Sequence, residues 1–268
     1  MSSVRQPSIS SSPSLFRKLT TEQEPFLAVR SLATNYASGY RIESHHHKWH
    51  QFLYATSGAM TLSTTNFSWM IPAGGAVFIP AHDPHTIRMW GIVQMRTLYF
   101  SPTLTDFQTQ ECQVVDVCPL LRELILRTTE LIALDTRVTR DSYMVAMLQD
   151  EIKMAIPTAT GSLGLPLPTD EHALIVAQEV LRYPLNVTPI DELAQRHGIA
   201  KRTLERRFHD ETGMSFGVWR QKARLLNSIR LLAEGKSVTD AALDSGYTSI
   251  SAFIAAFKST FGYTPGRV

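Results

Sequence analysis

Residues 193–213 read LAQRHGIAKRTLERRFHDETG, and this segment defines the C-terminal part of the molecule. Ala194, Gly198 and Leu204 have the spacing that a helix-turn-helix unit requires. The small alanine lets two helices cross closely, the glycine permits a tight turn, and the leucine anchors the second helix in the core. The segment therefore predicts a short helix over IDELAQR, a turn at HGI and a second helix that ends at Gly213.

The same layout recurs over residues 242–262, which read ALDSGYTSISAFIAAFKSTFG. Ala242 and Gly246 follow their counterparts in the first copy by 48 residues, and Phe253 follows its counterpart by 49. The intervening FGVWRQKARLLNSIRLLAEG, residues 216–235, has the periodicity of an amphipathic helix. Two ordered copies joined by a helix predict a duplicated, all-helical domain.

Each copy begins with the signals of a helix start. Thr188 is expected to be an N-cap, with Pro189 at the first helical position and Asp191 reaching back to the cap. Ser237 has the corresponding place in the second copy.

Basic residues are concentrated in one part of this domain. The whole chain has a net charge of only +2, but residues 196–230 contain nine Lys or Arg against three acidic residues. A local basic surface of this kind attracts a polyanion such as duplex DNA, although a solvated helix face has the same composition.

These segments strongly resemble the AraC/XylS family of transcription regulators. The resemblance is carried by LAQRHGIAKRTLERRFHDETG, ARLLNSIRLLAEG and ALDSGYTSISAFIAAFKSTFGYTPGR, and it covers about Thr169 to Arg267. It implies seven helices and two recognition helices whose separation suits successive major grooves, about 34 Å apart along the DNA axis. The implied function is sequence-specific DNA binding and transcription regulation.

The first recognition helix offers a cationic face. Leu204 and the residue one turn later point inward, so Arg202, Glu205 and Arg206 share the opposite face, with Lys201 beside them. Arginine can bind guanine through two hydrogen bonds and glutamate can accept from cytosine, which discriminates bases by about 1–3 kcal/mol. Phosphate contact or simple solvation is the alternative for each of them.

The second recognition helix offers an apolar face instead. The matching positions are Ile250, Ser251, Ile254 and Ala255, and the first cation is Lys258. Such a face can contact thymine methyl groups and donate one hydroxyl, but it cannot make a two-point contact to guanine. The first unit is therefore expected to supply most of the sequence discrimination, and the second to add phosphate anchoring from its helix N-terminus.

The N-terminal half has the residue pattern that is typical of a β-protein. Short runs rich in branched and aromatic residues, such as QFLYATSG, FSWMIPAGG and VQMRTLYF, alternate with turn signals. The predicted fold is α+β and multidomain, with an antiparallel β-barrel and flanking helices before the helical domain. We expect a mostly disordered tail over 1–24, the barrel over 25–105, a helical dimerisation or support segment over 106–156, a linker over 157–168 and the DNA-binding domain over 169–268.

Residues 39–58 resemble the first motif of the cupin family. The pattern is Gly39, His45-x-His47, Gln51 and Gly58, and a second motif is approximated by Gly74, Pro80 and His85. The resemblance implies a small barrel that receives inward side chains. On a strand His45, His47 and Gln51 fall on one face, because side chains alternate.

The sequence is compatible with two kinds of ligand in this pocket. Three imidazoles and a carbonyl oxygen could hold a divalent metal such as Fe, Ni, Zn or Mn. The sequence departs from the metal-binding pattern, since Gln51 replaces the usual glutamate, His82 replaces a glycine and the terminal asparagine is absent. The alternative is an ordinary sensing pocket for a small organic effector.

We interpret the chain as a non-enzymatic regulator that is controlled by a small effector, a metal ion or both. Its expected partners are an operator in double-stranded DNA, a small-molecule effector, a second copy of the chain and, for an activator, RNA polymerase. The alternative is a metal-dependent cupin oxygenase or isomerase fused to a DNA-binding tail. The absence of long apolar runs and of a secretory signal, and Cys112 and Cys118 without disulfide spacing, predict a cytoplasmic protein without membrane contact.

Overall fold

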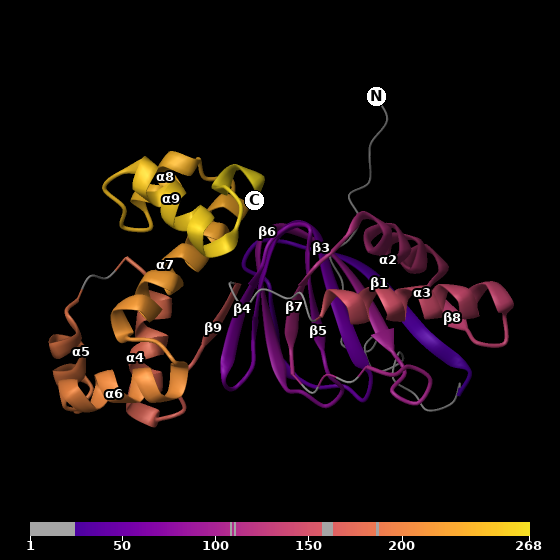
Figure 1. The fold of residues 1–268 in the computed structure, drawn as a ribbon, viewed down its shortest axis with the longest axis horizontal. Coiled ribbons are helices and arrows are strands. Elements are labelled where there is room, and N and C mark those ends of the chain that lie inside the picture. Colours follow the sequence, from indigo (N-terminus) through magenta and orange to yellow (C-terminus); the bar gives the residue numbers. More distant parts are fainter. Residues whose placement is uncertain (1–24, 108, 110, 157–162, 186–187) are drawn as a thin grey trace.

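The computed structural model describes residues 25–107, 109, 111–156, 163–185 and 188–268. A sheet-rich part precedes a helical part, and the two lie side by side (Figure 1). The α+β organisation predicted from the sequence is therefore confirmed. The expected tail over 1–24 and the first part of the expected linker, 157–162, lie outside the described residues.

Nine strands among the described residues form one antiparallel sheet. They are β1 (Leu27–Tyr36), β2 (Arg41–His45), β3 (His50–Ser63), β4 (Phe67–Ile71), β5 (Gly75–Ile79), β6 (His85–Phe100), β7 (Gln113–Asp116), β8 (Ala133–Asp135) and β9 (Gly164–Pro166).

The long strands β3 and β6 run through the whole sheet. The first half of β3 pairs with β5 and its second half with β4, while β6 pairs first with β2 and then with β1. The ladder between β3 and β6 shifts register between Ala55 and Ala59. Gly58 lies at this point with a φ of 70°, and a Cβ there would lie 2.8 Å from the carbonyl oxygen of Ile92. A glycine is therefore required where the two strands bend.

The sheet folds over a common core but does not close. The hydrogen-bonded order β7-β5-β3-β6-β1-β8 ends on two different strands, because β7 occupies the outer edge of β5 and β8 that of β1. The closed barrel predicted from the sequence is wrong in this respect. Buried residues from both halves, among them Leu53, Met60 and Ile87, still form one cluster.

Segments expected to be helix or linker also contribute strands. Strands β7 and β8 come from the region predicted as helical, and β9 comes from the predicted linker and pairs with β4. Leu163 and Leu165 are buried beside this pairing. The second half of the predicted linker is therefore part of the sheet.

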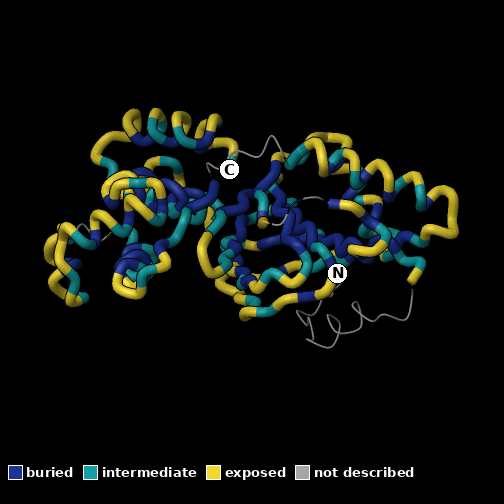
Figure 2. Tube along the Cα trace, turned by 60° about the horizontal axis from the view of Figure 1, so that its bottom comes forward, coloured by how far each residue is buried: buried dark blue, intermediate teal, exposed yellow. Residues whose placement is uncertain are grey.

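Two helices cover the β1 side of the sheet, as the periodicity of residues 119–156 predicts. Helices α2 (Pro119–Leu131) and α3 (Thr139–Ala155) bury Leu121, Ile125 and Leu148 in a second apolar cluster. Figure 2 shows their outer turns exposed and the strands beneath them buried. None of the described helices is long and apolar enough to cross a membrane.

The helical part contains the predicted duplication. Its helices are α4 (Glu171–Arg182), α5 (Ile190–Arg196), α6 (Lys201–Thr212), α7 (Phe216–Ala233), α8 (Val238–Leu243) and α9 (Ile250–Phe261), followed by the 3-10 turn η2 (Pro265–Arg267). Gly198 and Gly246 both have positive φ, 66° and 81°, in the turns of the two units. Helices α6 and α9 both end at a left-handed glycine.

The predicted caps are confirmed in one unit and wrong in the other. The Oγ of Ser237 accepts a hydrogen bond from the backbone N–H of Asp240 at 3.0 Å, as expected. In the first unit Pro189 itself is the N-cap, and no side chain caps α5. Thr188 instead offers its carbonyl oxygen to Arg220 at 2.7 Å, which holds the chain one residue away from the expected start.

Helix α7 fastens the helical part to the sheet. The indole Nε1 of Trp219 donates to the carbonyl oxygen of Pro166 at 2.7 Å, and Trp219 is fully buried. At the other end of α7, a Cβ at Gly91 would lie 2.1 Å from the carbonyl oxygen of Ala233. At Gly91 the two parts therefore meet in backbone contact, and this position has no space for a side chain.

We expect Gly91→Ala to destabilise the protein more than the matched change Gly74→Ala. Both glycines have positive φ, 68° and 81°, so either alanine costs about 1–2 kcal/mol of backbone strain. Only at Gly91 does the new methyl group meet a backbone atom, whereas nothing lies within 4 Å at Gly74. Urea unfolding should give Gly91→Ala the lower free energy of unfolding by about 1 kcal/mol or more. Equal losses in the two variants would contradict the tight contact.

Candidate DNA interface and histidine cluster

The outer face of α6 carries the cations that the sequence predicted. Leu204 and Phe208 are fully buried and fix the orientation of the helix. Arg202, Glu205 and Arg206 are exposed on the opposite face, and so is Lys201 in the first turn. Among the described residues no ion pair holds Lys201, Arg202 or Arg206 in place, so their charges face solvent.

Most other basic residues of this region are engaged within the domain. Arg196 pairs with Glu179 and Glu192, Arg207 with Asp170 and Glu211, and Arg230 with Glu234, while Arg220 and Arg224 donate to the carbonyl oxygens of Thr188 and Pro184. Burial lowers the pKa of the Lys222 ammonium. Of the basic residues in this stretch, Lys201, Arg202 and Arg206 in the first turns of α6 are therefore the ones best placed to contact DNA.

The face of α9 is apolar, as expected. Phe253, Phe257 and Phe261 are buried, and Ile250 and Ser251 are exposed in the first turn. Ile254 is only half-buried, so part of its side chain also reaches the surface. The Oγ of Ser249 accepts from the N–H of Ala252 at 3.4 Å, and Ser249 thereby caps the helix.

Helix α7 holds the two units apart. The first unit packs on its N-terminal half, where the ring of Phe208 lies 5.2 Å from that of Trp219. The second unit packs on its C-terminal half through α8. Figure 1 shows α5 and α6 at one end of α7 and α8 and α9 at the other. This is the separated pair of recognition helices that the family resemblance implies.

The predicted histidines of the N-terminal part lie together. One ring nitrogen each of His45, His47 and His85 lies within 4.8 Å of the others. His45 ends β2, but His47 lies in the connection after it, so the shared strand face predicted for the two is wrong. The chain turn brings them together instead, and β6 adds His85 by pairing with His45.

Backbone carbonyls orient all three imidazoles. The Nδ1 atoms of His45, His47 and His85 lie 2.9, 2.6 and 2.8 Å from the carbonyl oxygens of Glu43, Trp49 and Asp83. A neutral imidazole that donates Nδ1–H to a carbonyl oxygen carries its lone pair on Nε2. The buried Nε2 of His85 has no hydrogen-bond partner in the part of the chain that the structure describes.

Gln51 completes the cluster, and it brings in a residue that the sequence analysis missed. The Oε1 of Gln51 lies 2.6 Å from the Nε2 of His47, and its Nε2 donates to the hydroxyl of Tyr99 at 3.3 Å. The ring of Tyr99 also lies 5.3 Å from that of His47. The only signal for Tyr99 is the register of β3 with β6, which places it opposite Gln51.

Burial disfavours the charged form of His47 and His85. It lowers the pKa of His47 and lowers that of His85 to about 3, because the imidazolium form loses its hydration. It also raises the pKa of the Tyr99 hydroxyl above its usual range. At neutral pH His47 and His85 are therefore neutral, and with the oxygen atoms of Gln51 and Tyr99 they can bind a cation or hydrogen-bond a small ligand.

Known proteins match both parts of the chain. A model of the AraC-like ligand binding domain matches residues 28–153, and a model of a helix-turn-helix domain matches residues 193–268. The HTH-type transcriptional regulator NimR of Escherichia coli is 29% identical over 223 residues, 83% of this chain and 80% of that protein. Regulatory protein SoxS of Salmonella typhimurium is 34% identical over 88 residues, 32% of this chain and 79% of that protein. A solved structure of fatty acid-bound ToxT from Vibrio cholerae aligns with 90% of this chain and 94% of that chain, at 12% identity and a TM-score of 0.38.

We expect the metal-free protein to lose stability as the pH falls from 7 to 5, and His85→Gln to lose less. The pKa of His85 is about 3 in the folded chain and about 6.5 unfolded, so the unfolded state gains protons first, and stability declines from about pH 6.5 down to about pH 3. For His85 alone the decline between pH 7 and pH 5 is about 2 kcal/mol. Urea unfolding of chelator-treated protein at the two pH values measures it. His209→Gln, at an exposed histidine, is the control and should retain the full decline. A decline as large in His85→Gln as in the wild type would contradict the assignment.

Proposed function

The chain belongs to the AraC/XylS family of DNA-binding transcription regulators, and from that premise we propose how it reads DNA and what controls it. The observation that carries the first proposal is the unpaired cationic face of α6. Arg202 and Arg206 contact guanine edges in one major groove, Glu205 contacts a neighbouring cytosine, and Lys201 contacts a phosphate.

In the second unit, α9 contributes shape complementarity to the DNA more than recognition of individual bases. Ile250 and the exposed part of Ile254 contact thymine methyl groups, and Ser251 donates a hydroxyl. The free N–H groups in the first turn of α9 anchor a phosphate of the next groove. Two grooves are thus read unequally, because only α6 carries side chains that can bind a base at two points.

Arg206→Ala should relax base preference, and Ile254→Ala should have the smaller effect. Loss of a two-point contact to guanine costs about 1–3 kcal/mol, or about 5- to 150-fold in affinity for the preferred base but little for the others. Quantitative binding to an operator and its single-base variants measures this at fixed salt concentration. Arg127→Ala, on α2 far from α6, is the matched control. A larger loss of discrimination in Ile254→Ala than in Arg206→Ala would refute the division of roles.

We further propose that the ligand-binding domain holds a divalent metal ion at His45, His47 and His85, with Gln51 beside it. Support comes from the backbone carbonyls on the three Nδ1 atoms, since metal-bound histidines are commonly oriented through their other ring nitrogen. The orphaned, buried Nε2 of His85 and the Gln51 oxygen facing His47 also fit a cation better than an apolar effector. Three imidazoles and one neutral oxygen suit Fe, Ni, Zn or Mn.

Protein expressed without an affinity tag should contain about one equivalent of metal by elemental analysis, and His47→Ala should lose most of it. His46→Ala is the matched control, because His46 is an exposed neighbour outside the cluster and its loss should change nothing. Metal-free wild-type protein, or equal loading of the two variants, would favour an organic effector in this pocket. Substrate turnover by the metal-loaded protein would instead favour the cupin enzyme.

A homodimer through α3 is the assembly we propose. Tyr143, Met147 and Met154 are exposed on α3 at helical spacing, with exposed fractions of 68%, 44% and 66%. A second copy that covers this row would space two DNA-binding domains along an operator. A monomer at micromolar concentration in sedimentation velocity would contradict this. We also propose that the protein acts in the cytoplasm. If it activates transcription, it contacts RNA polymerase.

A further inference from the structure

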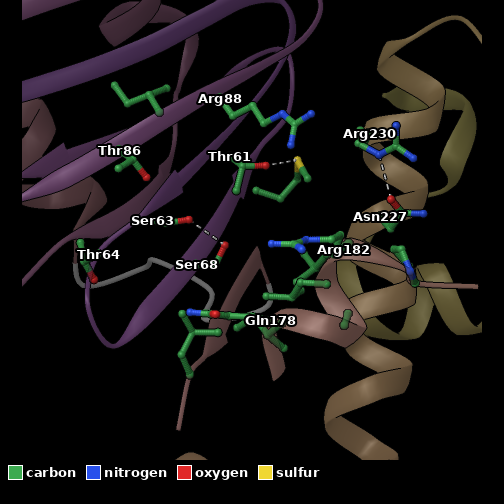
Figure 3. Close-up of a pocket in the computed structure, with 18 of the residues that line it drawn as sticks. Thr61, Ser63, Thr64, Ser68, Thr86, Arg88, Gln178, Arg182, Asn227 and Arg230 are labelled. Atoms are coloured by element: carbon green, nitrogen blue, oxygen red, sulfur yellow. Dashed lines mark hydrogen bonds between the residues drawn. The ribbon is translucent and has the colours of Figure 1, made fainter. Parts of the chain in front are cut away.

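A cavity lies between the sheet and the DNA-binding domain, and the clustered histidines His45, His47 and His85 are not part of its lining. Its volume is about 820 Å³, which is within the range of about 300–1,000 Å³ typical of small-molecule sites. Strands β3, β4 and β6 form one wall, and helices α4 and α7 form the other (Figure 3). Whatever fills it touches both parts of the molecule.

The charge of the cavity has one sign. Its lining includes four arginines, Arg41, Arg88, Arg182 and Arg230, and no aspartate or glutamate. Arg41 and Arg230 are balanced by Glu43 and Glu234, which lie outside the lining. Among the described residues no carboxylate pairs with Arg88 or Arg182. Two uncompensated guanidinium groups therefore border the cavity from opposite walls.

The rest of the lining is apolar or hydroxylated. Leu165, Leu174 and Leu226 belong to the apolar part. Hydroxyl groups come from the strands, where Ser63 and Ser68 lie 3.3 Å apart. This mixture suits a ligand with an apolar body and a polar end.

Trp90 contacts both the arginines and the hydroxylated part of the lining. The guanidinium carbons of Arg88 and Arg230 lie 4.2 and 5.0 Å from the centre of its ring, and its Nε1 donates to the Oγ1 of Thr61 at 2.7 Å. The cation-π contacts hold one arginine from the sheet and one from α7 on the same indole. In Figure 3, Arg88 reaches from the strands toward the helices, and Arg182 reaches from the end of α4 toward the strands.

We propose that this cavity binds an amphipathic organic acid, a carboxylate on an apolar aliphatic or aromatic body. Arg88 and Arg182 bind the carboxylate, since a guanidinium matches two carboxylate oxygens, and the leucines and Trp90 contact the body. The site is separate from the histidine cluster and goes beyond the proposed metal. Because its walls belong to different domains, the acid sets how the DNA-binding domain sits on the sheet, and so changes the affinity for the operator.

Octanoate and 4-phenylbenzoate are the probes, and the neutral octanamide and 4-phenylbenzamide are their matched controls. Titration calorimetry on the full chain should show at least one acid binding tenfold or more tighter than its amide. Arg88→Gln and Arg182→Gln should each weaken that binding fivefold or more, whereas Arg127→Gln on α2 should not. Both arginines are exposed, so the variants should keep the wild-type melting temperature and the wild-type affinity for DNA without acid.

Three results would overturn the proposal. They are no binding of either acid at millimolar concentration, equal binding of acid and amide, and unchanged binding in Arg182→Gln. Inorganic phosphate should not compete; full competition would mean a site for a free anion instead. His47→Ala separates the two sites, because it should lose metal and still bind the acid, and loss of acid binding there would place the acid at the histidines.

Discussion

The buried face of α7 is the constraint on which the rest of the molecule depends. This one helix packs against both helix-turn-helix units and against strands β3, β4 and β6. Trp219 shows how closely these roles are combined, since its ring contacts Phe208 of the first recognition helix while its indole N–H binds the backbone of β9. The spacing of the recognition helices and the attachment of the sensor domain are thus set by the same side chains.

Local pattern was enough to predict the helical domain and much of the sheet. The two units were recognisable because each keeps its small residue, glycine and apolar anchor within about a dozen residues. Strands β7, β8 and β9 were missed because each is three or four residues long and exists only through pairing with a distant strand. The open sheet was missed for the same reason, as closure depends on which strands occupy the edges rather than on the pattern within any strand.

In the candidate sites too, residues with a characteristic local spacing were predicted, and residues brought in from distant parts of the chain were not. Spacing within the chain identified His45, His47 and Gln51, and it identified the cations of α6. It could not supply the hydroxyl of Tyr99, which reaches the cluster through the register of β6 with β3. Helical periodicity already separated Arg206 from Arg207, and what it could not supply is that carboxylates within the domain bind Arg207. The cavity between the domains combines residues from 41–90 with residues from 165–230, and no pattern within either segment predicts it.

The first four residues of strand β6, His85 to Arg88, have a consequence for signalling. His85 and Ile87 are buried and Arg88 is exposed, and Thr86, Ile87 and Arg88 all line the cavity between the domains. One short stretch of backbone therefore carries both a histidine of the cluster, His85, and an arginine of the cavity, Arg88. Thermodynamic linkage requires any energy passed through that backbone to be mutual, so an occupant on one side must alter the affinity on the other by the same factor that it experiences in return. Two chemically unrelated ligands are in this way coupled to each other within the ligand-binding domain before either affects the operator.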